Sequence, residues 1–228
     1  MKNLRVITLT IMIFSILSFT VENKKKLLVI GDSISLGYGP ELKNMLDSNF
    51  EYYTKETGSG YGNLDIPTGP NSGDSRMVLD YFRHLSKNKN FHTDLLLLNC
   101  GLHDIKTVPQ TNTKIFNKTL YKNNLDSIFR IIKKMKIQVI WVNTTPVNDS
   151  IHNSKRVGFY RFNQDVIEYN QIADSICSRR HIPVIDLYSF SKKFPLSAIA
   201  DHVHYKPEYA KLQAAYIAGF VATLKLNN

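Results

Sequence analysis

Cysteine is scarce in this sequence, with only Cys100 and Cys177 among 228 residues. Two cysteines cannot build the disulfide framework that holds many small secreted domains together, so stability must come from a packed core in which we expect both to be buried. The chain also lacks internal repeats, low-complexity segments and an interdomain linker. With 43% hydrophobic and 21% charged residues, its composition excludes disorder, collagen and coiled coil and is typical of one globular domain.

Acidic residues are in short supply, since 19 Asp and Glu face 29 Lys and Arg and leave a formal net charge of +10. Such an excess raises the question of a polyanionic partner. The basic residues fall in small clusters, most of them near expected helix ends, where cations complement the helix dipole. We therefore predict a solvated surface and no nucleic-acid partner, with a polyanion-attracting face as the alternative. The clusters are Lys24 to Lys26, Lys133, Lys134 and Lys136, Arg179 and Arg180, and Lys192 and Lys193.

A hydrophobic run long enough to span a membrane comfortably is missing, because about 20 apolar residues are needed. The uncharged apolar run at 6–19 has 14 residues and follows Lys2 and Arg5, which is typical of a secretory signal peptide. We predict a signal peptide at 1–20 and a mature domain at 21–228 that is secreted or periplasmic. Stable membrane insertion is not expected after cleavage, and an uncleaved anchor is the alternative.

Short buried-strand patterns alternate with helical patterns along the rest of the chain. Continuous apolar runs bounded by turn residues predict buried strands, and apolar residues at helical spacing predict helices. Parallel strands need crossover helices and bury both surfaces, so the alternation indicates a three-layer α/β domain with a five-stranded parallel sheet. Ligands in such sheets bind at the carboxyl ends of the strands. The predicted strands are 26–30, 50–54, 94–100, 138–143 and 183–186, and the helices 40–48, 75–86, 121–135, 161–180 and 207–226.

Polar residues with the chemistry of a hydrolase follow the first strand and precede the last helix. Ser33 lies at a Gly-flanked turn after the first strand, where it can be a nucleophile or a helix N-cap. Asp201 and His204 lie three residues apart in one loop, a spacing that suits a carboxylate orienting an imidazole base. Alternatives are a capping Asp with surface His, or a zinc site in which His202 and His204 are joined by Asp32 or His103.

These segments resemble the SGNH or GDSL hydrolase family over almost the whole mature chain. The first block is matched by Gly31-Asp-Ser-Ile-Ser35, the last by Asp201-His-Val-His204, and a second by Asn71-Ser-Gly-Asp-Ser75. The resemblance implies a flavodoxin-like α/β fold and a serine esterase without metal or cofactor, in which Ser33, His204 and Asp201 form the catalytic triad.

The resemblance also implies an oxyanion hole made by the backbone N–H groups of Ser33 and Gly73 and by a third donor. Gly58, Gly60 and Gly62 are weaker candidates than Gly73, and each glycine can equally serve a tight turn. The family's third block reads Gly-x-Asn-Asp, whereas this chain has His103 in place of the Asn. A neutral imidazole still has one N–H donor, so we expect His103 to replace the Asn; the alternative is weakened oxyanion stabilisation.

The substrate depends on the loops rather than on the blocks. The predicted loops at 57–74 and 146–160 offer polar and aromatic residues suited to sugar rings and no long apolar stretch. We therefore expect the protein to remove O-acetyl groups from a carbohydrate, and the positive charge favours an acidic glycan. Alternatives are a lipid or short-chain acyl esterase, a lysophospholipase, or a non-catalytic glycan-binding protein. The sugar-binding candidates are Tyr61, Asn63, Asn71, His152, Asn153 and Tyr160.

Overall fold

A computed structural model describes residues 24–55 and 64–224 of the protein. The predicted signal peptide at 1–20, together with Gly58, Gly60, Gly62, Tyr61 and Asn63, lies outside the described residues. In the part of the chain that is described, no helix is long and apolar enough to cross a membrane.

Five parallel strands form the central sheet in the order β2-β1-β3-β6-β7. This order is that of the flavodoxin-like doubly wound sheets and confirms the predicted fold class. Each strand lies within one or two residues of its prediction because buried parallel strands are short apolar runs. Their bounds are β1 Lys25–Ile30, β2 Phe50–Thr54, β3 Leu95–Leu98, β6 Gln138–Val142 and β7 Val184–Ile185.

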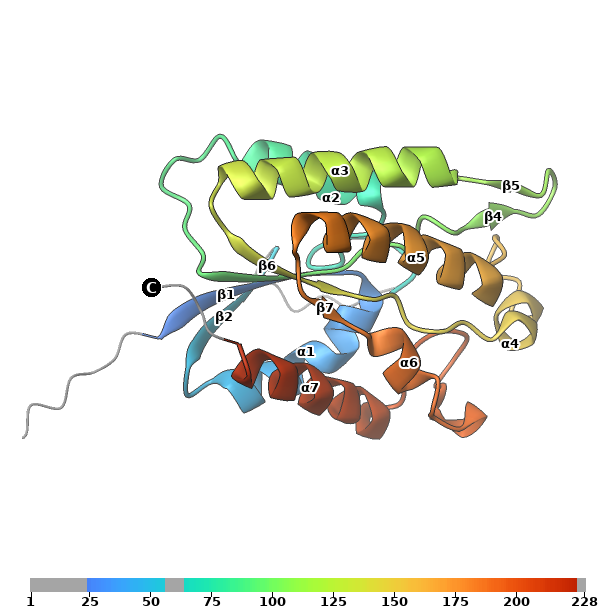
Figure 1. The fold of residues 1–228 in the computed structure, drawn as a ribbon. Helices are drawn as coiled ribbons and strands as arrows, with labels where there is room; N and C mark the ends of the chain where they lie inside the picture. The colour runs from blue at the N-terminus through green and yellow to red at the C-terminus, as the bar shows by residue number, and fades with distance from the viewer. Residues whose placement is uncertain (1–23, 56–63, 225–228) are drawn as a thin grey trace, which may run out of the picture.

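Helices cover both faces of the sheet (Figure 1). Helices α1 and α7 pack against each other on one face, and α2, α3 and α5 form the layer on the other. The apolar strand residues are enclosed between the layers, so that Leu95–Leu98 are each at most 1% exposed. The helices are α1 Ser33–Leu46, α2 Ser75–Leu85, α3 Lys118–Lys134, α5 Asn163–Arg180 and α7 Pro207–Ala222. Cys100 and Cys177 are free thiols buried in this core, as predicted.

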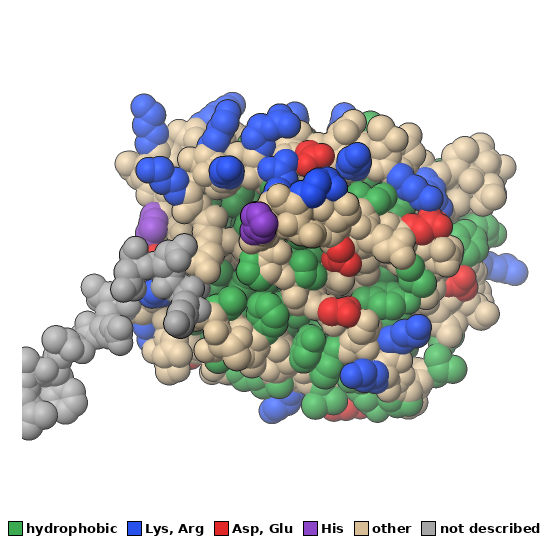
Figure 2. Space-filling model, viewed as in Figure 1, with side chains coloured by type: hydrophobic (Ala, Val, Ile, Leu, Met, Phe, Trp, Pro, Cys, Tyr) green, Lys and Arg blue, Asp and Glu red, His purple; other side chains and the backbone are tan. Residues whose placement is uncertain are grey.

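Two of the basic clusters occupy helix ends as predicted, whereas Lys25 and Lys26 begin strand β1. Lys133 and Lys134 lie in the last turn of α3, and Arg179 and Arg180 in that of α5. Lys and Arg side chains gather over α3 in Figure 2. This placement agrees with cations complementing helix dipoles.

Three parts of the prediction were wrong. Helix α1 begins at Ser33 rather than at residue 40, because the Asp32 side chain caps it directly after β1, and Pro40 lies inside it. The expected loop at 146–160 contains a short helix, α4 (Asp149–Ser154), capped by Asn148. Short elements too brief for a periodic signal were also missed: the hairpin β4 Thr107–Val108 with β5 Thr113–Lys114, helix α6 Leu187–Ser191 and the 3₁₀ turn η1 Leu196–Ala198.

Candidate active site

The end of β1 presents Ser33 as the first residue of α1. The side chain of Asp32 accepts a hydrogen bond from Ile34 N–H at 3.0 Å and is the N-cap of this helix. Because Asp32 performs the capping, the Ser33 hydroxyl does not. Gly31 is required by a close approach, since a Cβ at this position would lie 2.7 Å from Ser35 Cβ. The turn thus presents the Ser33 hydroxyl at the carboxyl end of the sheet.

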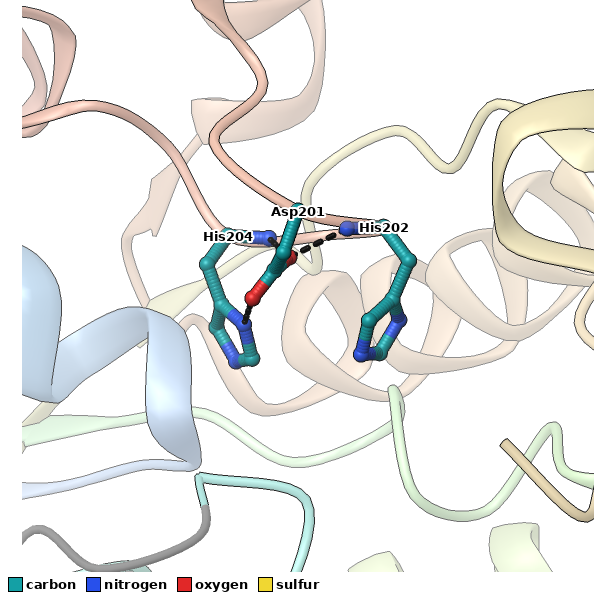
Figure 3. A group of neighbouring side chains, drawn as sticks. All are labelled: Asp201, His202 and His204. Atoms are coloured by element: carbon teal, nitrogen blue, oxygen red, sulfur yellow. Dashed lines mark hydrogen bonds and ion pairs between the residues drawn. The ribbon is translucent and has the colours of Figure 1, made fainter. Parts of the chain in front are cut away.

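Asp201 and His204 form a local unit in the loop before α7 (Figure 3). Asp201 Oδ1 accepts hydrogen bonds from the backbone N–H groups of His202, Val203 and His204, the last two at 3.0 Å. Its Oδ2 lies 2.6 Å from His204 Nδ1. Burial alone would raise the pKa of Asp201, but these hydrogen bonds outweigh it and hold the pKa well below its usual range. The carboxylate is therefore ionised and accepts the proton of Nδ1.

The same imidazole contacts Ser33 from its other side. His204 Nε2 lies 2.8 Å from Ser33 Oγ, although the two residues are 171 positions apart. Because the ionised Asp201 fixes the proton of the neutral ring on Nδ1, Nε2 has its lone pair facing the hydroxyl and accepts from it. The structure thus brings the three predicted triad residues into one hydrogen-bonded chain.

The zinc alternative conflicts with this geometry. Both nitrogens of His204 are engaged by Asp201 and Ser33. His202 Nδ1 lies 2.9 Å from His152 Nδ1, and His202 Nε2 lies 3.0 Å from Asp65 Oδ2. Ligand atoms of Asp201, His202 and His204 lie within 4.8 Å of one another, but a metal held by His202 and His204 would have to displace these hydrogen-bond partners.

Residues 71 and 72 place Gly73 beside the end of β1. Asn71 forms an isolated parallel bridge with Gly31, and Ser72 N–H donates to Gly31 C=O at 2.9 Å. Gly73 has φ +68°, and a Cβ would lie 2.6 Å from Met77 Sδ, so glycine is required here. Its N–H donates to Asn71 Oδ1 at 3.0 Å. The predicted oxyanion donor is therefore engaged within its own turn and must be shared or released to act on a substrate.

His103 lies in the turn at residues 101–104, which the buried carboxyl of Asp104 fixes to the start of α2. Asp104 is fully buried and accepts from the Ser75 N–H and hydroxyl at the start of α2. Burial raises the pKa of Asp104 to about 8. His103 is 3% exposed, and its Nε2 has no partner among the described residues. Burial, followed by the charges of Lys106 and Arg161, lowers the pKa of His103 well below its usual range, so the ring is neutral.

The loop residues expected to meet sugar rings mostly serve the fold instead. His152 is fully buried against His202, Asn71 bonds to Gly73 and Leu64, and Asn153 bonds to the backbone of Arg161. For His152 and Asn153 the reason is that the segment at 146–160 folds into α4 rather than an open loop. Asn71 is buried in the turn before α2, where its side chain bonds to the backbone. Tyr160 remains exposed at 36%.

Sequence reasoning missed several ionisable residues close to the triad. Asp65 holds His202, while Lys106 and Arg161 lie near enough to His103 to influence its pKa. They come from separate segments without a shared motif. The net positive charge was the only signal in the sequence, and it did not point to these positions.

Comparison with known proteins places the chain in a family. The profile of the GDSL-like lipase/acylhydrolase family matches residues 29–212. The chain therefore belongs to this family, which is a family of esterases. No curated protein sequence matches the chain.

Several solved structures share the fold at low sequence identity. A GDSL-like lipase from Bacteroides thetaiotaomicron is 19% identical, with a TM-score of 0.63 over 90% of this chain and 91% of the other. A lipase/acylhydrolase from Enterococcus faecalis is 17% identical, with a TM-score of 0.63 over 90% and 99% of the two chains. An acetyl xylan esterase is 16% identical, with a TM-score of 0.62 over 87% and 100%. Identities this low support the shared fold and do not identify the substrate.

Proposed function

We propose that the protein is a serine esterase that removes O-acetyl groups from a carbohydrate and acts outside the cytoplasm, in the periplasm or as a secreted enzyme. The hydrogen-bonded chain of Ser33, His204 and Asp201 at the carboxyl end of β1 is the observation that carries the catalytic part of this proposal. The signal-like segment at 1–20 supports the location.

Ser33 is the nucleophile and His204 the base. His204 Nε2 takes the proton as Ser33 Oγ bonds to the ester carbonyl carbon, and Asp201 stabilises the resulting imidazolium. The imidazolium then protonates the alcohol oxygen as the ester C–O bond breaks and the alcohol leaves. A water molecule, deprotonated by His204, attacks the acyl group on Ser33, and collapse of this second intermediate returns the proton to Oγ and releases the acid.

Three donors stabilise the oxyanion that forms on the carbonyl oxygen. The N–H of Ser33 lies at the first turn of α1, where helix N–H groups have no intrahelical acceptor. His103 supplies the second donor through its unpartnered Nε2. Gly73 supplies the third by sharing or releasing its bond to Asn71. Preorganised donors of this kind lower the barrier because they need little rearrangement as charge develops.

The close surroundings of the triad favour a small acyl group. Ser33 is 3% and His204 8% exposed, which suits acetyl better than a long hydrocarbon chain. The acetyl xylan esterase is a distant structural neighbour with the same fold and is consistent with a carbohydrate substrate. A lipid or short-chain acyl esterase is the second candidate.

Acetate release by the mature protein from 4-nitrophenyl acetate and from acetylated xylan oligosaccharides tests this proposal. Wild type should release acetate and react with a fluorophosphonate probe, and Ser33→Ala should do neither. Ser35→Ala is the matched control, because Ser35 is a buried hydroxyl of the same helix whose Oγ donates to Asp32 C=O. This control should retain labelling.

The acyl preference separates the candidates. Faster hydrolysis of octanoyl than acetyl esters would favour the lipid esterase. Glycan binding that is equal in wild type and Ser33→Ala, without labelling or turnover, would refute the esterase proposal.

A further inference from the structure

Arg161 is a buried cation, two of whose nitrogens have no hydrogen-bond partner among the residues that the structure describes. Its side chain is fixed by Nε, which donates to Leu102 C=O at 2.8 Å, and its backbone by two hydrogen bonds with the Asn153 amide. The residue is 0% exposed, and neither Nη1 nor Nη2 has a hydrogen-bond partner within the described part of the chain. Leaving charged donors buried without acceptors is strongly unfavourable.

A second cation lies beside the same aromatic ring. Lys106 Nζ lies 4.3 Å and Arg161 Cζ 4.8 Å from the centroid of the Phe159 ring. Burial, together with the repulsion of Arg161, lowers the pKa of Lys106 to about 8. Like charges brought together in a partly buried place repel each other strongly, and an anion between them would relieve this repulsion.

The nearby carboxylates attract these cations, but none forms an ion pair with Arg161 among the described residues. Asp65 and Asp201 accept hydrogen bonds from His202 and His204 respectively, and Asp32 accepts one from Ile34 N–H. Burial lowers the pKa of Arg161 to about 10, and the attraction of the three aspartates limits that fall. The guanidinium is thus charged at neutral pH.

Arg161 is anchored to the turn that carries the proposed oxyanion donor. Its Nε donates to the carbonyl of Leu102, and the next residue is His103, whose Nε2 is likewise buried with no partner in the described ranges 24–55 and 64–224. Arg161 is buried from solvent, but Ser33 and His204 are also less than 10% exposed, so burial alone does not exclude Arg161 from contact with a substrate. The charges of Asp32 and Asp201 act on Arg161, and those of Arg161 and His204 act on His103, so the unsatisfied donors lie near the Ser33–His204–Asp201 chain.

We propose that Arg161 and Lys106 form a subsite for a carboxylate of the substrate, so that the protein hydrolyses esters of acidic sugars. This inference rests on the proposed esterase function and specifies its substrate class. A carboxylate accepts two parallel hydrogen bonds from a guanidinium fork, which matches the two free nitrogens of Arg161. Lys106 supplies a second positive charge on the side of the Phe159 ring.

Binding to the Ser33→Ala variant tests the subsite without turnover. The two probes are an O-acetylated methyl glucuronoside and the matching glucuronamide, which differ only by a carboxylate and a neutral amide. Calorimetry should give a Kd about 10- to 100-fold lower for the carboxylate, the range expected for a hydrogen-bonded charge pair. The ratio of the two Kd values should fall as salt is added, because screening weakens charge pairing.

Substitutions show which residues produce the ratio of the amide Kd to the carboxylate Kd. Arg161→Gln should bring it close to one, Lys106→Met should reduce it about 3- to 10-fold, and Arg161→Lys should keep part of it because charge remains without the fork. Lys155→Met is the matched control, since Lys155 is an exposed lysine at the end of α4, and the ratio should stay unchanged. Circular dichroism verifies folding, and Lys106→Met decides the matter if Arg161→Gln does not fold.

Two results would overturn the proposal. Equal Kd values for the two probes would mean that water or the neighbouring aspartates satisfy Arg161. A preference that persists in both Lys106→Met and Arg161→Gln would place the carboxylate elsewhere. Hydrolysis of 4-nitrophenyl acetate by wild type is measured in parallel, so that failure of the esterase function is distinguished from failure of the subsite.

Discussion

Removal of the His103 side chain tests the least conventional part of the proposed site. The neutral imidazole can offer one N–H, and its buried Nε2 has no hydrogen-bond partner among the described residues, so a substrate oxyanion can take that place. Loss of one oxyanion donor costs about 100- to 1000-fold in turnover. We therefore expect His103→Ala to lower kcat for 4-nitrophenyl acetate by that factor. His103→Asn, which restores the family's usual amide donor, should stay within about tenfold of wild type.

A stability measurement separates this effect from damage to the fold. His103→Ala leaves a cavity but also removes an unsatisfied buried nitrogen, and the two effects oppose each other. The free energy of unfolding should change by no more than about 2 kcal/mol in urea titrations. The lowered pKa of His103 means that wild type loses stability relative to His103→Asn as the pH falls below about 6.5, because only the unfolded ring readily takes a proton.

The reasoning would be refuted by His103→Ala with kcat within threefold of wild type, provided that Ser33→Ala is inactive. The oxyanion would then be held by the Ser33 and Gly73 N–H groups alone. A higher kcat in His103→Asn than in wild type would show instead that histidine is the poorer donor.

Three further predictions concern the supports of the site. Asp201→Asn should keep the backbone bonds to Oδ1 but lose the correct His204 tautomer, lowering kcat by about 10³- to 10⁴-fold; a loss below tenfold in the same assay would contradict this. Gly73→Ala should destabilise the protein by about 1–3 kcal/mol in urea unfolding, since φ is +68° and Met77 Sδ is too close; unchanged stability would contradict it. The pKa of Asp104 is raised to about 8 in the folded protein, so between about pH 4 and 8 the unfolded carboxyl ionises while the folded one stays protonated, and wild type loses stability as the pH rises. Asp104→Asn lacks this carboxyl and should therefore gain stability relative to wild type over the same range. A Tm difference between variant and wild type that is equal at pH 5 and pH 8 would contradict this.

The sheet could be predicted from the sequence because a strand buried on both faces reads as an unbroken apolar run. Residues 95–98 are four leucines, and all are buried in β3. The start of α1 could not be predicted equally well. Pro40 is typical of a first helical turn, but the capping bond from Ile34 N–H to Asp32 starts the helix seven residues earlier.

The triad could be predicted because its residues lie in two short segments with a recognisable pattern, and only their meeting requires the fold. The two cations beside the Phe159 ring, Lys106 and Arg161, lie in segments without such a pattern. Lys106, Phe159 and Arg161 meet through the pairing of Thr107 with Tyr160, an isolated bridge between distant segments. Contacts of this kind depend on the path of the chain, and single-residue chemistry does not reveal them.

The arrangement of the Asp201–His204 turn has a consequence for how the protein loses activity. Ala200 N–H donates to His204 C=O at 2.7 Å, so the acid and base are held in one small turn next to α7. Ser33 belongs to α1, and the Ser33–His204 contact therefore depends on the packing of α1 against α7. A local opening that detaches α7 would part Ser33, the proposed nucleophile, from an intact Asp201–His204 pair while the sheet stays folded. Mild heat or denaturant should then abolish turnover before the cooperative melting of the core, and the loss should be reversible.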